Sequence, residues 1–141
     1  MSCCDNREVV TTEKAKAVGA YSVGIKAGHF VFCAGQLGMD QETGNLVEGG
    51  IEAETRQALE NLSNILKAAG SSLERVVKTT VFLRDINDFA RMNAVYAESF
   101  PVDPPARSAF QVGALPRGAA VEIEAIALLI PDEDSEGCCS E

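Results

Sequence analysis

The sequence predicts an α+β fold in which a mixed β-sheet carries two helices packed on one of its faces. Three observations support this prediction. Segments rich in Val, Ile, Thr and Phe have the character of strands, two other segments repeat apolar residues at helical spacing, and their order is β-β-β-α-β-α-β-β. A chain of 141 residues, 46% of them hydrophobic, is large enough to fold as one domain around a single core.

The N-terminal third is expected to form three strands and a loop. The strand segments are residues 7–12, 22–26 and 30–34. The second and third segments flank Gly28, which indicates a hairpin. Residues 35–50 contain five glycines together with Asp40 and Asn45, so this segment is expected to be a loop.

Two amphipathic helices follow from the spacing of apolar residues. In the first helix these residues fall at offsets 0, 4, 7, 8 and 11, at Ala58, Leu62, Ile65, Leu66 and Ala69. Glu52 and Glu54 suit the positive N-terminal end of this helix, and Gly70 suits the position just after its C-terminus. In the second helix the offsets are 0, 3, 7 and 11, at Phe89, Met92, Tyr96 and Phe100. Asp85 or Asn87 can cap its start.

Three further strands complete the sheet and are expected at residues 76–83, 107–112 and 121–130. Alternation along the last strand separates Glu122 and Glu124 from an apolar set that belongs against the helices. In the preceding strand, Phe110 is expected to face the helices, which puts Arg107 and Gln111 on the uncovered face. The uncovered face also receives Ile126, Leu128 and Ile130. A monomer would leave this apolar patch in water, so the patch is expected to pack on another subunit.

The charges on the uncovered face have two interpretations. The first is a solvated sheet face with cross-strand ion pairs, which is the ordinary structural role of such residues. Against it, a simple loop over residues 113–120 offsets Arg107 and Glu122 by about 13 Å at strand rise, so the two would not pair within the chain. The second interpretation is a site in which they converge across a subunit boundary.

Composition limits the class of function. The chain has 12 basic and 21 acidic residues, and its net charge of −9 disfavours binding to the phosphate backbone of nucleic acid. No apolar run approaches the roughly 20 residues of a membrane span, and residues 1–8 do not resemble a secretory signal. The expected organisation is a flexible tail over residues 1–6, one domain over 7–131 and an acidic flexible tail over 132–141.

The five cysteines indicate a reducing compartment, the cytoplasm or alternatively the mitochondrion, and no disulfide framework. Cys3-Cys4 and Cys138-Cys139 are adjacent pairs, a spacing that does not suit zinc, so no metal site is expected. Cys33 is expected to be a small buried hydrophobe. The single histidine, His29, is expected to be exposed in a turn.

Seven short segments match one protein family in order and spacing. They are Gly19-Ala20-Tyr21-Ser22, Ala34-Gly35-Gln36, Val77-Lys78-Thr79-Thr80-Val81, Asp85-Ile86-Asn87-Asp88-Phe89, Asn93-Ala94-Val95-Tyr96, Pro105-Ala106-Arg107-Ser108 and Val121-Glu122-Ile123-Glu124-Ala125. Through them the chain, from about Val9 to Leu129, resembles the RidA/YjgF family of reactive-intermediate deaminases. The resemblance implies a fold similar to chorismate mutase of the bacillus type, and a homotrimer with a ligand cleft at each subunit interface.

The resemblance also implies an activity: hydrolysis of 2-iminobutanoate and 2-iminopropanoate to 2-oxo acids and ammonia, without a cofactor. Arg107 matches the family's substrate arginine, and a planar, permanently charged fork suits a carboxylate. Glu122 matches the acid that positions or activates water. Tyr21 matches a tyrosine lining the cleft, Asn93 a polar residue near it, and Gly35 a residue that lets the backbone approach the ligand closely.

Two positions depart from the family pattern. Ala34 stands where many members have serine, which removes a hydroxyl and one hydrogen bond to the ligand or its water. Ala109 stands where many have cysteine, but it keeps the backbone N–H that this position often offers to the ligand. Two other functions stay open: a small-ligand-binding or chaperone-like protein without turnover, and an endoribonuclease or translation inhibitor.

Overall fold

The computed structural model describes residues 6–131, and its elements follow the predicted order. The strands in this range are β1 (Arg7–Val10), β2 (Gly24–Ala27), β3 (Phe30–Leu37), β4 (Val76–Leu83), β5 (Ala106–Gln111) and β6 (Val121–Leu128). The helices are α1 (Gly50–Ala68) and α2 (Phe89–Ser99), and the short 3-10 turns are η2 (Leu73–Arg75), η3 (Ile86–Asp88) and η4 (Pro116–Gly118). Apart from Asn6, the predicted tails lie outside the described residues, and so do Cys3-Cys4 and Cys138-Cys139.

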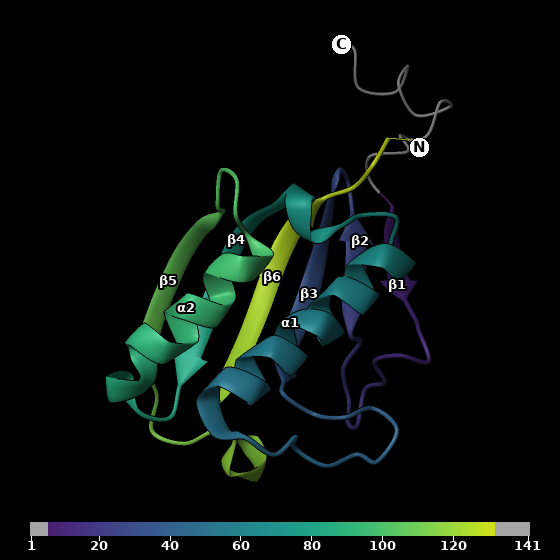
Figure 1. Ribbon diagram of the computed structural model, residues 1–141. Coiled ribbons are helices and arrows are strands. Elements are labelled where there is room, and N and C mark those ends of the chain that lie inside the picture. The colour runs from purple at the N-terminus through teal and green to yellow at the C-terminus, as the bar shows by residue number, and fades with distance from the viewer. Residues whose placement is uncertain (1–5, 132–141) are drawn as a thin grey trace.

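The predicted α+β fold is confirmed, because the strands form one mixed sheet with both helices on the same face (Figure 1). The strand order is β1-β2-β3-β6-β4-β5. β4 and β5 are parallel, and each of the other neighbouring pairs is antiparallel. A parallel pair needs a crossover connection, which α2 provides here. β6 comes last in the sequence but lies inside the sheet, between β3 and β4.

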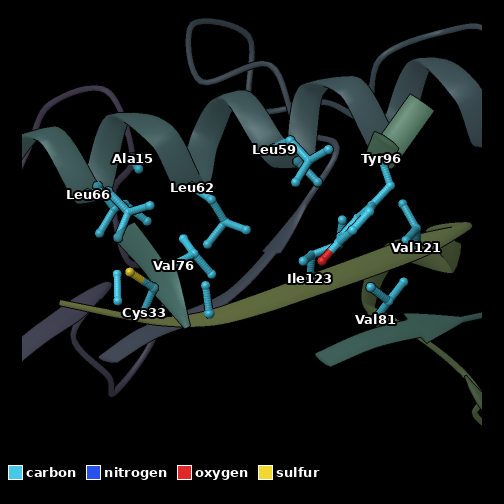
Figure 2. Packing of buried hydrophobic residues seen from close by; sticks show 14 of the residues in the cluster. Ala15, Cys33, Leu59, Leu62, Leu66, Val76, Val81, Tyr96, Val121 and Ile123 are labelled. Carbon is cyan, nitrogen blue, oxygen red and sulfur yellow. The ribbon is translucent and has the colours of Figure 1, made fainter. Parts of the chain in front are cut away.

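The core lies between α1 and the sheet (Figure 2). Leu62 and Leu66 of α1 are fully buried, as are Val31 of β3 and Ile123 of β6. Burying a side chain of this size contributes about 1.5–3 kcal/mol, and the helical and strand spacing predicted Leu62, Leu66 and Ile123 as core positions. Cys33 is buried, as predicted, and burial raises the pKa of its thiol to about 12.

Capping interactions fix the helix ends near the predicted positions. Gly70 follows α1 with a φ of 80°, and the Ser71 amide donates to the Leu66 carbonyl over 2.8 Å, which is a Schellman ending. Ahead of α2, Asp85 is the capping residue of the predicted pair: its Oδ1 accepts a hydrogen bond from the amide of Asn87 over 2.9 Å. This contact caps the η3 turn, which leads directly into α2.

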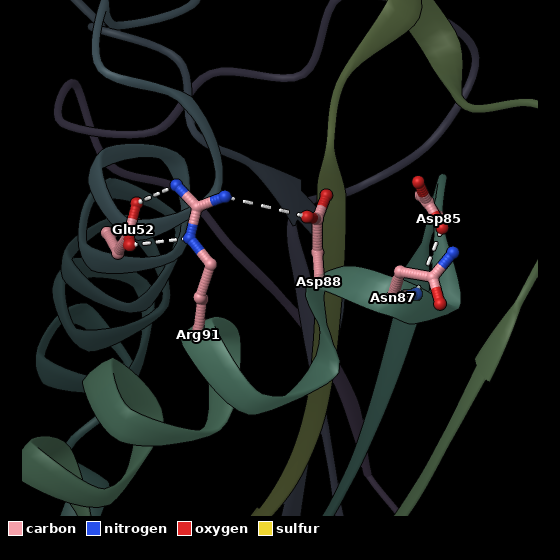
Figure 3. A network of polar contacts seen from close by, with 5 residues as sticks. All are labelled: Glu52, Asp85, Asn87, Asp88 and Arg91. Carbon is pink, nitrogen blue, oxygen red and sulfur yellow. Dashed lines mark hydrogen bonds and ion pairs between the residues drawn. The ribbon is translucent and has the colours of Figure 1, made fainter.

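An ion-pair network connects α1 to α2 at the surface (Figure 3). Arg91 of α2 donates from Nε and Nη2 to the two carboxylate oxygens of Glu52 on α1, both over 2.8 Å. The hydrogen bond from Arg91 lowers the pKa of Glu52. Asp88 lies 3.8 Å from Nη1 of the same arginine. Because Arg91 and Glu52 are largely exposed, the network orients the two helices more than it adds to stability.

The predicted orientation of β5 is wrong. The parallel register pairs Arg107 with Thr79 and Gln111 with Leu83, and both of these β4 residues are fully buried on the helix side. Arg107 and Gln111 therefore face the helices, whereas Phe110 is 44% exposed on the opposite face. Alternation separates the two faces of a strand but does not say which face meets the helices, and in this edge strand the more apolar face does not.

The side of the sheet away from the helices, here called the open face, is mixed in character, as predicted, and its polar residues include Lys78, Thr80, Glu122 and Glu124. It carries Phe30, Phe32, Phe82, Phe110, Ile126 and Leu128. Phe110 packs edge-on against Phe82 with their ring centroids 5.5 Å apart, and Phe32 remains 45% exposed. Ile130 lies beyond the end of β6, where its amide donates to the Gly70 carbonyl over 3.1 Å. The open face therefore has the character of a contact surface.

Replacing Gly38 with alanine is expected to destabilise the fold. A Cβ at this position would lie 2.5 Å from both Cα and the carbonyl oxygen of Glu54 on α1, so the helix or the loop after β3 must shift. Overpacking of this kind costs about 1–3 kcal/mol of unfolding free energy, which urea unfolding can measure. Gly113→Ala is the matched control, because a Cβ there meets no atom within 4 Å. Equal unfolding midpoints for the two variants would contradict the prediction.

Candidate functional site

A pocket of about 340 Å3 opens beside the end of β3 and the start of β6. Its volume falls in the range of small-molecule sites. It is lined by Lys16, Val18, Tyr21, Ala34, Gly35, Gln36, Leu37, Met39, Gln41, Pro116, Arg117 and Glu122. Three of the residues predicted for the site, Tyr21, Gly35 and Glu122, therefore lie together in this pocket.

The carboxylate of Glu122 lies directly over Gly35. The ladder between β3 and β6 shifts register between Cys33 and Gln36, so Gly35 sits in an irregular stretch of β3. A Cβ on Gly35 would meet Oε1 of Glu122 at 2.7 Å and its Cδ at 2.8 Å. A side chain at this position would displace the carboxyl group of Glu122, which is a different close approach from the one expected from the sequence.

Glu122 is half-buried, and its pKa is raised. The main cause is burial, which disfavours the charged carboxylate, and the like charge of Glu124 adds to it. A carboxyl group with a raised pKa can both accept and return a proton closer to neutral pH than an ordinary glutamate. Glu122 is therefore the group in the pocket best suited to transfer protons, because the other lining residues include no aspartate or glutamate.

Two buried polar residues of α1 hold the walls of the pocket. Asn61 donates from its side-chain amide to the carbonyls of Leu37 and Met39, over 3.1 and 3.0 Å. Glu54, which the sequence suggested as a partner of the helix N-terminus, is buried and accepts a hydrogen bond from the Ala120 amide over 2.9 Å. The loop after β3 and the start of β6 are thus both fixed to the same helix.

Tyr21 forms part of the rim and is 48% exposed. Its hydroxyl oxygen accepts a hydrogen bond from the Val18 amide over 3.3 Å, which leaves the hydroxyl hydrogen available to a ligand or a water. The segment around it is turned by a hydrogen bond from the Tyr21 amide to the Gly19 carbonyl over 2.9 Å.

Arg107 belongs to a second cluster, formed with side chains of α2. Its Nη1 donates to Oδ1 of Asn93 over 2.7 Å, and its guanidinium carbon lies 4.7 Å from the ring centroid of Tyr96 and 5.3 Å from that of Phe89. The Tyr96 hydroxyl is 2.7 Å from Oγ1 of Thr79. Burial raises the pKa of Tyr96. Stacking on two rings and one amide contact hold the guanidinium in a defined orientation.

Within one chain, the predicted site residues fall into two separate groups. Glu122 lies on the open-face side of β6, whereas Arg107 and Asn93 lie on the helix side at the sheet edge. β4 separates the two strands, so the simple hairpin loop considered for residues 113–120 does not exist, and the offset argument built on it does not apply. No ion pair among residues 6–131 joins Arg107 to Glu122, because the two residues lie on different strands and on opposite sides of the sheet. Ala109 belongs to the second group, because the register of β5 pairs it with buried Val81.

Sequence reasoning missed four polar residues of the pocket, namely Lys16, Gln36, Gln41 and Arg117. Arg117 has a φ of 59° and donates from Nη1 to the Gly44 carbonyl over 2.7 Å. The Pro116-Arg117-Gly118 turn was visible in the sequence as part of a Gly/Pro loop. Nothing in that pattern shows that the turn comes to lie beside residues 16 to 21.

In the described part of the chain, no three His, Cys, Asp or Glu side chains gather closely enough to hold a metal ion. His29 is exposed, as predicted, and lies in the turn between β2 and β3. None of the helices between residues 6 and 131 has the length and apolar character needed to cross a bilayer.

The sequence profile of the endoribonuclease L-PSP family matches residues 11–129. The chain belongs to this family. Solved members of similar fold include proteins named RidA and YjgF, so the family resemblance found in the sequence is confirmed.

Several relatives of this L-PSP family chain match it over nearly their whole length. A RutC family protein of Pyrococcus horikoshii is 55% identical over 122 residues, which is 86% of this chain and 97% of the relative. A Rattus norvegicus protein named 2-iminobutanoate/2-iminopropanoate deaminase is 51% identical over 126 residues, which is 89% of this chain and 92% of the rat protein. Among solved structures, E. coli TdcF with bound serine has a TM-score of 0.83 at 38% identity and covers 87% of this chain and 99% of its own.

Replacing Glu122 with glutamine is expected to change how stability depends on pH. A carboxyl whose pKa rises on folding binds its proton more tightly in the native state, so its contribution is greatest below the unfolded pKa and is lost as the pH rises through the folded pKa. Near neutral pH, Glu122→Gln should therefore unfold at a higher urea concentration than the wild type. The difference should narrow below the ordinary glutamate pKa of about 4.5.

Urea midpoints of both proteins, measured across this pH range, test the expectation. Glu60→Gln is the matched control, because it removes one negative charge from an exposed position on α1. Wild type and Glu122→Gln with parallel pH profiles would show that the native state does not perturb Glu122.

Proposed function

We propose that this L-PSP family chain hydrolyses 2-imino acids, such as 2-iminobutanoate and 2-iminopropanoate, to 2-oxo acids and ammonia. The observation that carries the proposal is the half-buried carboxyl of Glu122, with its raised pKa, over Gly35 in the pocket. The name of the rat relative supports the substrate class. The serine bound to E. coli TdcF, a small amino acid with a carboxylate, supports the ligand size.

In the proposed reaction, Glu122 takes a proton from a water molecule as the water oxygen attacks the carbon of the protonated imine. The product is a tetrahedral carbinolamine, and the proton held by Glu122 passes to its nitrogen. The C–N bond then breaks, ammonia leaves, and the hydroxyl becomes the carbonyl of the 2-oxo acid after losing its proton. The hydrogen of the Tyr21 hydroxyl is placed to orient the water or the substrate, because its oxygen already accepts from the Val18 amide.

Arg107 is proposed to bind the substrate carboxylate. Asn93 engages one of its five N–H donors, and the rings of Tyr96 and Phe89 hold the plane of the guanidinium. An edge of the fork therefore remains for bidentate contact with a carboxylate. Asn93 then acts as a positioning residue, and Ala109 contributes its backbone N–H near the same ligand.

A site that uses both Arg107 and Glu122 needs two copies of the chain, because the two residues lie on opposite sides of the sheet in one copy. We propose a homotrimer with a cleft at each subunit interface, as the family resemblance implies. The open face supports self-association, because Phe32 and Phe110 are 45% and 44% exposed in the single chain. We also propose a reducing compartment, the cytoplasm, in which the buried thiol of Cys33 stays unpaired.

RNA cleavage is the second candidate, because the family is named after an endoribonuclease, L-PSP. The net charge of −9 weighs against it, since a protein that grips a phosphate backbone needs a basic surface. A ligand-binding protein without turnover would keep the pocket but would have no use for a carboxyl with a raised pKa. Imine hydrolysis accounts for both the small pocket and the raised pKa of Glu122.

Ammonia release from 2-iminobutanoate, generated in situ by threonine dehydratase acting on threonine, tests the proposed function directly. Wild type should accelerate the release, and Glu122→Gln should lower the rate by roughly 100-fold or more while still binding 2-oxobutanoate, because the amide cannot accept a proton from water. Glu60→Gln is the matched control: it removes one carboxylate from an exposed position on α1 that does not line the pocket. Wild-type rates in Glu122→Gln would sink the proposed mechanism.

Mixing two impaired variants tests whether the site is shared between copies. Arg107→Lys keeps the charge but loses the fork, so its affinity for 2-oxobutanoate should fall by roughly one to two orders of magnitude. When Arg107→Lys and Glu122→Gln chains are unfolded and refolded together, one copy can supply Glu122 and its neighbour Arg107. In random assembly, an intact Glu122 meets an intact Arg107 at roughly a quarter of the interfaces. About a quarter of the wild-type activity should therefore return.

Each variant refolded alone is the control for this mixing experiment, with melting temperatures to show that both are folded. No recovery of activity in the mixture, with assembly shown by sedimentation, would mean that one chain supplies the whole site.

A further inference from the structure

Two cations of the pocket have no part in the proposed mechanism. Lys16 and Arg117 both line it, and Glu122 is the single acid among its lining residues. The pocket is therefore locally positive in a chain whose net charge is −9. A concave site of this charge, surrounded by an acidic surface, favours an anionic ligand.

Neither cation is used to neutralise Glu122. Within residues 6–131, no ion pair of 4.0 Å or less joins Glu122 to Lys16 or Arg117. A cation in close contact would lower the pKa of Glu122, but that pKa is raised, through burial and the charge of Glu124. Both cations therefore line the same pocket as Glu122 without being engaged by its carboxyl group.

The backbone at Arg117 is held in an unfavourable conformation. Its φ of 59° and ψ of 16° lie in the left-handed region, which favours glycine, asparagine and aspartate over arginine. Its Nη1 is anchored to the Gly44 carbonyl over 2.7 Å, which ties the η4 turn to the loop after β3. Backbone strain of this kind is often found at functional sites, where it fixes the direction of a side chain. Here the strained residue is part of the pocket wall.

The position of the reacting group fixes which end of a substrate meets these cations. The imine carbon must lie near Glu122, and the adjoining carboxylate is assigned to Arg107 in the proposed function. The remaining end of the substrate is then free to reach Arg117 and Lys16. An uncharged methyl group, as in 2-iminobutanoate, makes no use of two cations at that end.

We propose that Arg117 and Lys16 bind a second acidic group at the far end of the substrate, so that the pocket accepts 2-imino dicarboxylic acids. This inference rests on the proposed function for the reaction, and it adds the class of substrate. Arg117 makes the stronger contact, because its guanidinium keeps further N–H donors beside the one used by Gly44 and suits a carboxylate bidentately. Lys16 adds a point charge.

Calorimetry with two stable 2-oxo acids tests the second anion site without turnover. 2-Oxoglutarate and 2-oxopentanoate have the same five-carbon chain and differ in a terminal carboxylate or methyl group. The wild type should bind 2-oxoglutarate roughly tenfold or more tightly than 2-oxopentanoate, and Arg117→Asn should lose most of this preference. Asparagine tolerates the left-handed backbone, so the variant should fold, which its melting temperature checks.

Two further variants sharpen the comparison. Lys16→Gln should reduce the preference by a smaller factor than Arg117→Asn. Arg56→Gln removes one positive charge from an exposed ion pair with Glu98, far from the pocket lining, and should leave the preference unchanged. Equal binding of the two acids by the wild type, no binding of either, or a preference retained in Arg117→Asn would each overturn the inference.

Ammonia release from 2-iminobutanoate, measured on the same wild-type preparation, separates this inference from the proposed function. Release of ammonia without a preference for 2-oxoglutarate would overturn the second anion site and leave the deaminase proposal standing. A preference that depends on Arg117, without any release of ammonia, would support the anion site and overturn the proposed reaction.

Discussion

The insertion of β6 between β3 and β4 is the constraint on which the rest of the molecule depends. β6 pairs with both neighbours, so its helix-side residues, Ile123 among them, are fully buried beneath α1. Because side chains alternate along a strand, the same pairing turns Glu122 to the other side, over Gly35. The register that forms the core therefore also places the carboxyl group of the candidate site.

The two halves of the candidate site depend on different elements. Glu122 and the pocket walls are fixed to α1, through the buried side chains of Asn61 and Glu54. Arg107 is fixed to α2, through Asn93 and the ring of Tyr96. Since α2 is the crossover that makes β5 parallel to β4, the orientation of the arginine is set by the same connection that completes the sheet.

The charge of the molecule is unevenly distributed in a way that bears on ligand choice. The chain is strongly acidic, yet its pocket has more cations than acids among its lining residues. A small anion is repelled by most of the surface and attracted at the pocket, which favours selective binding of small acids over extended polyanions. This arrangement fits a small-molecule site better than a surface for nucleic acid.

Local patterns in the sequence determined the elements, their order and the placement of Ile126 and Leu128 on the open face, because helical and strand periodicities are read over a few residues. They also indicated Gly70 as the end of α1, whereas Glu122 was singled out by the family resemblance rather than by periodicity. Only the tertiary structure decided which side of β5 meets the helices, since both sides of an edge strand are partly exposed and the choice depends on long-range pairing with β4. It also brought Lys16 and Arg117 into one pocket, because that pocket forms only when segments far apart in the sequence meet beside β3 and β6.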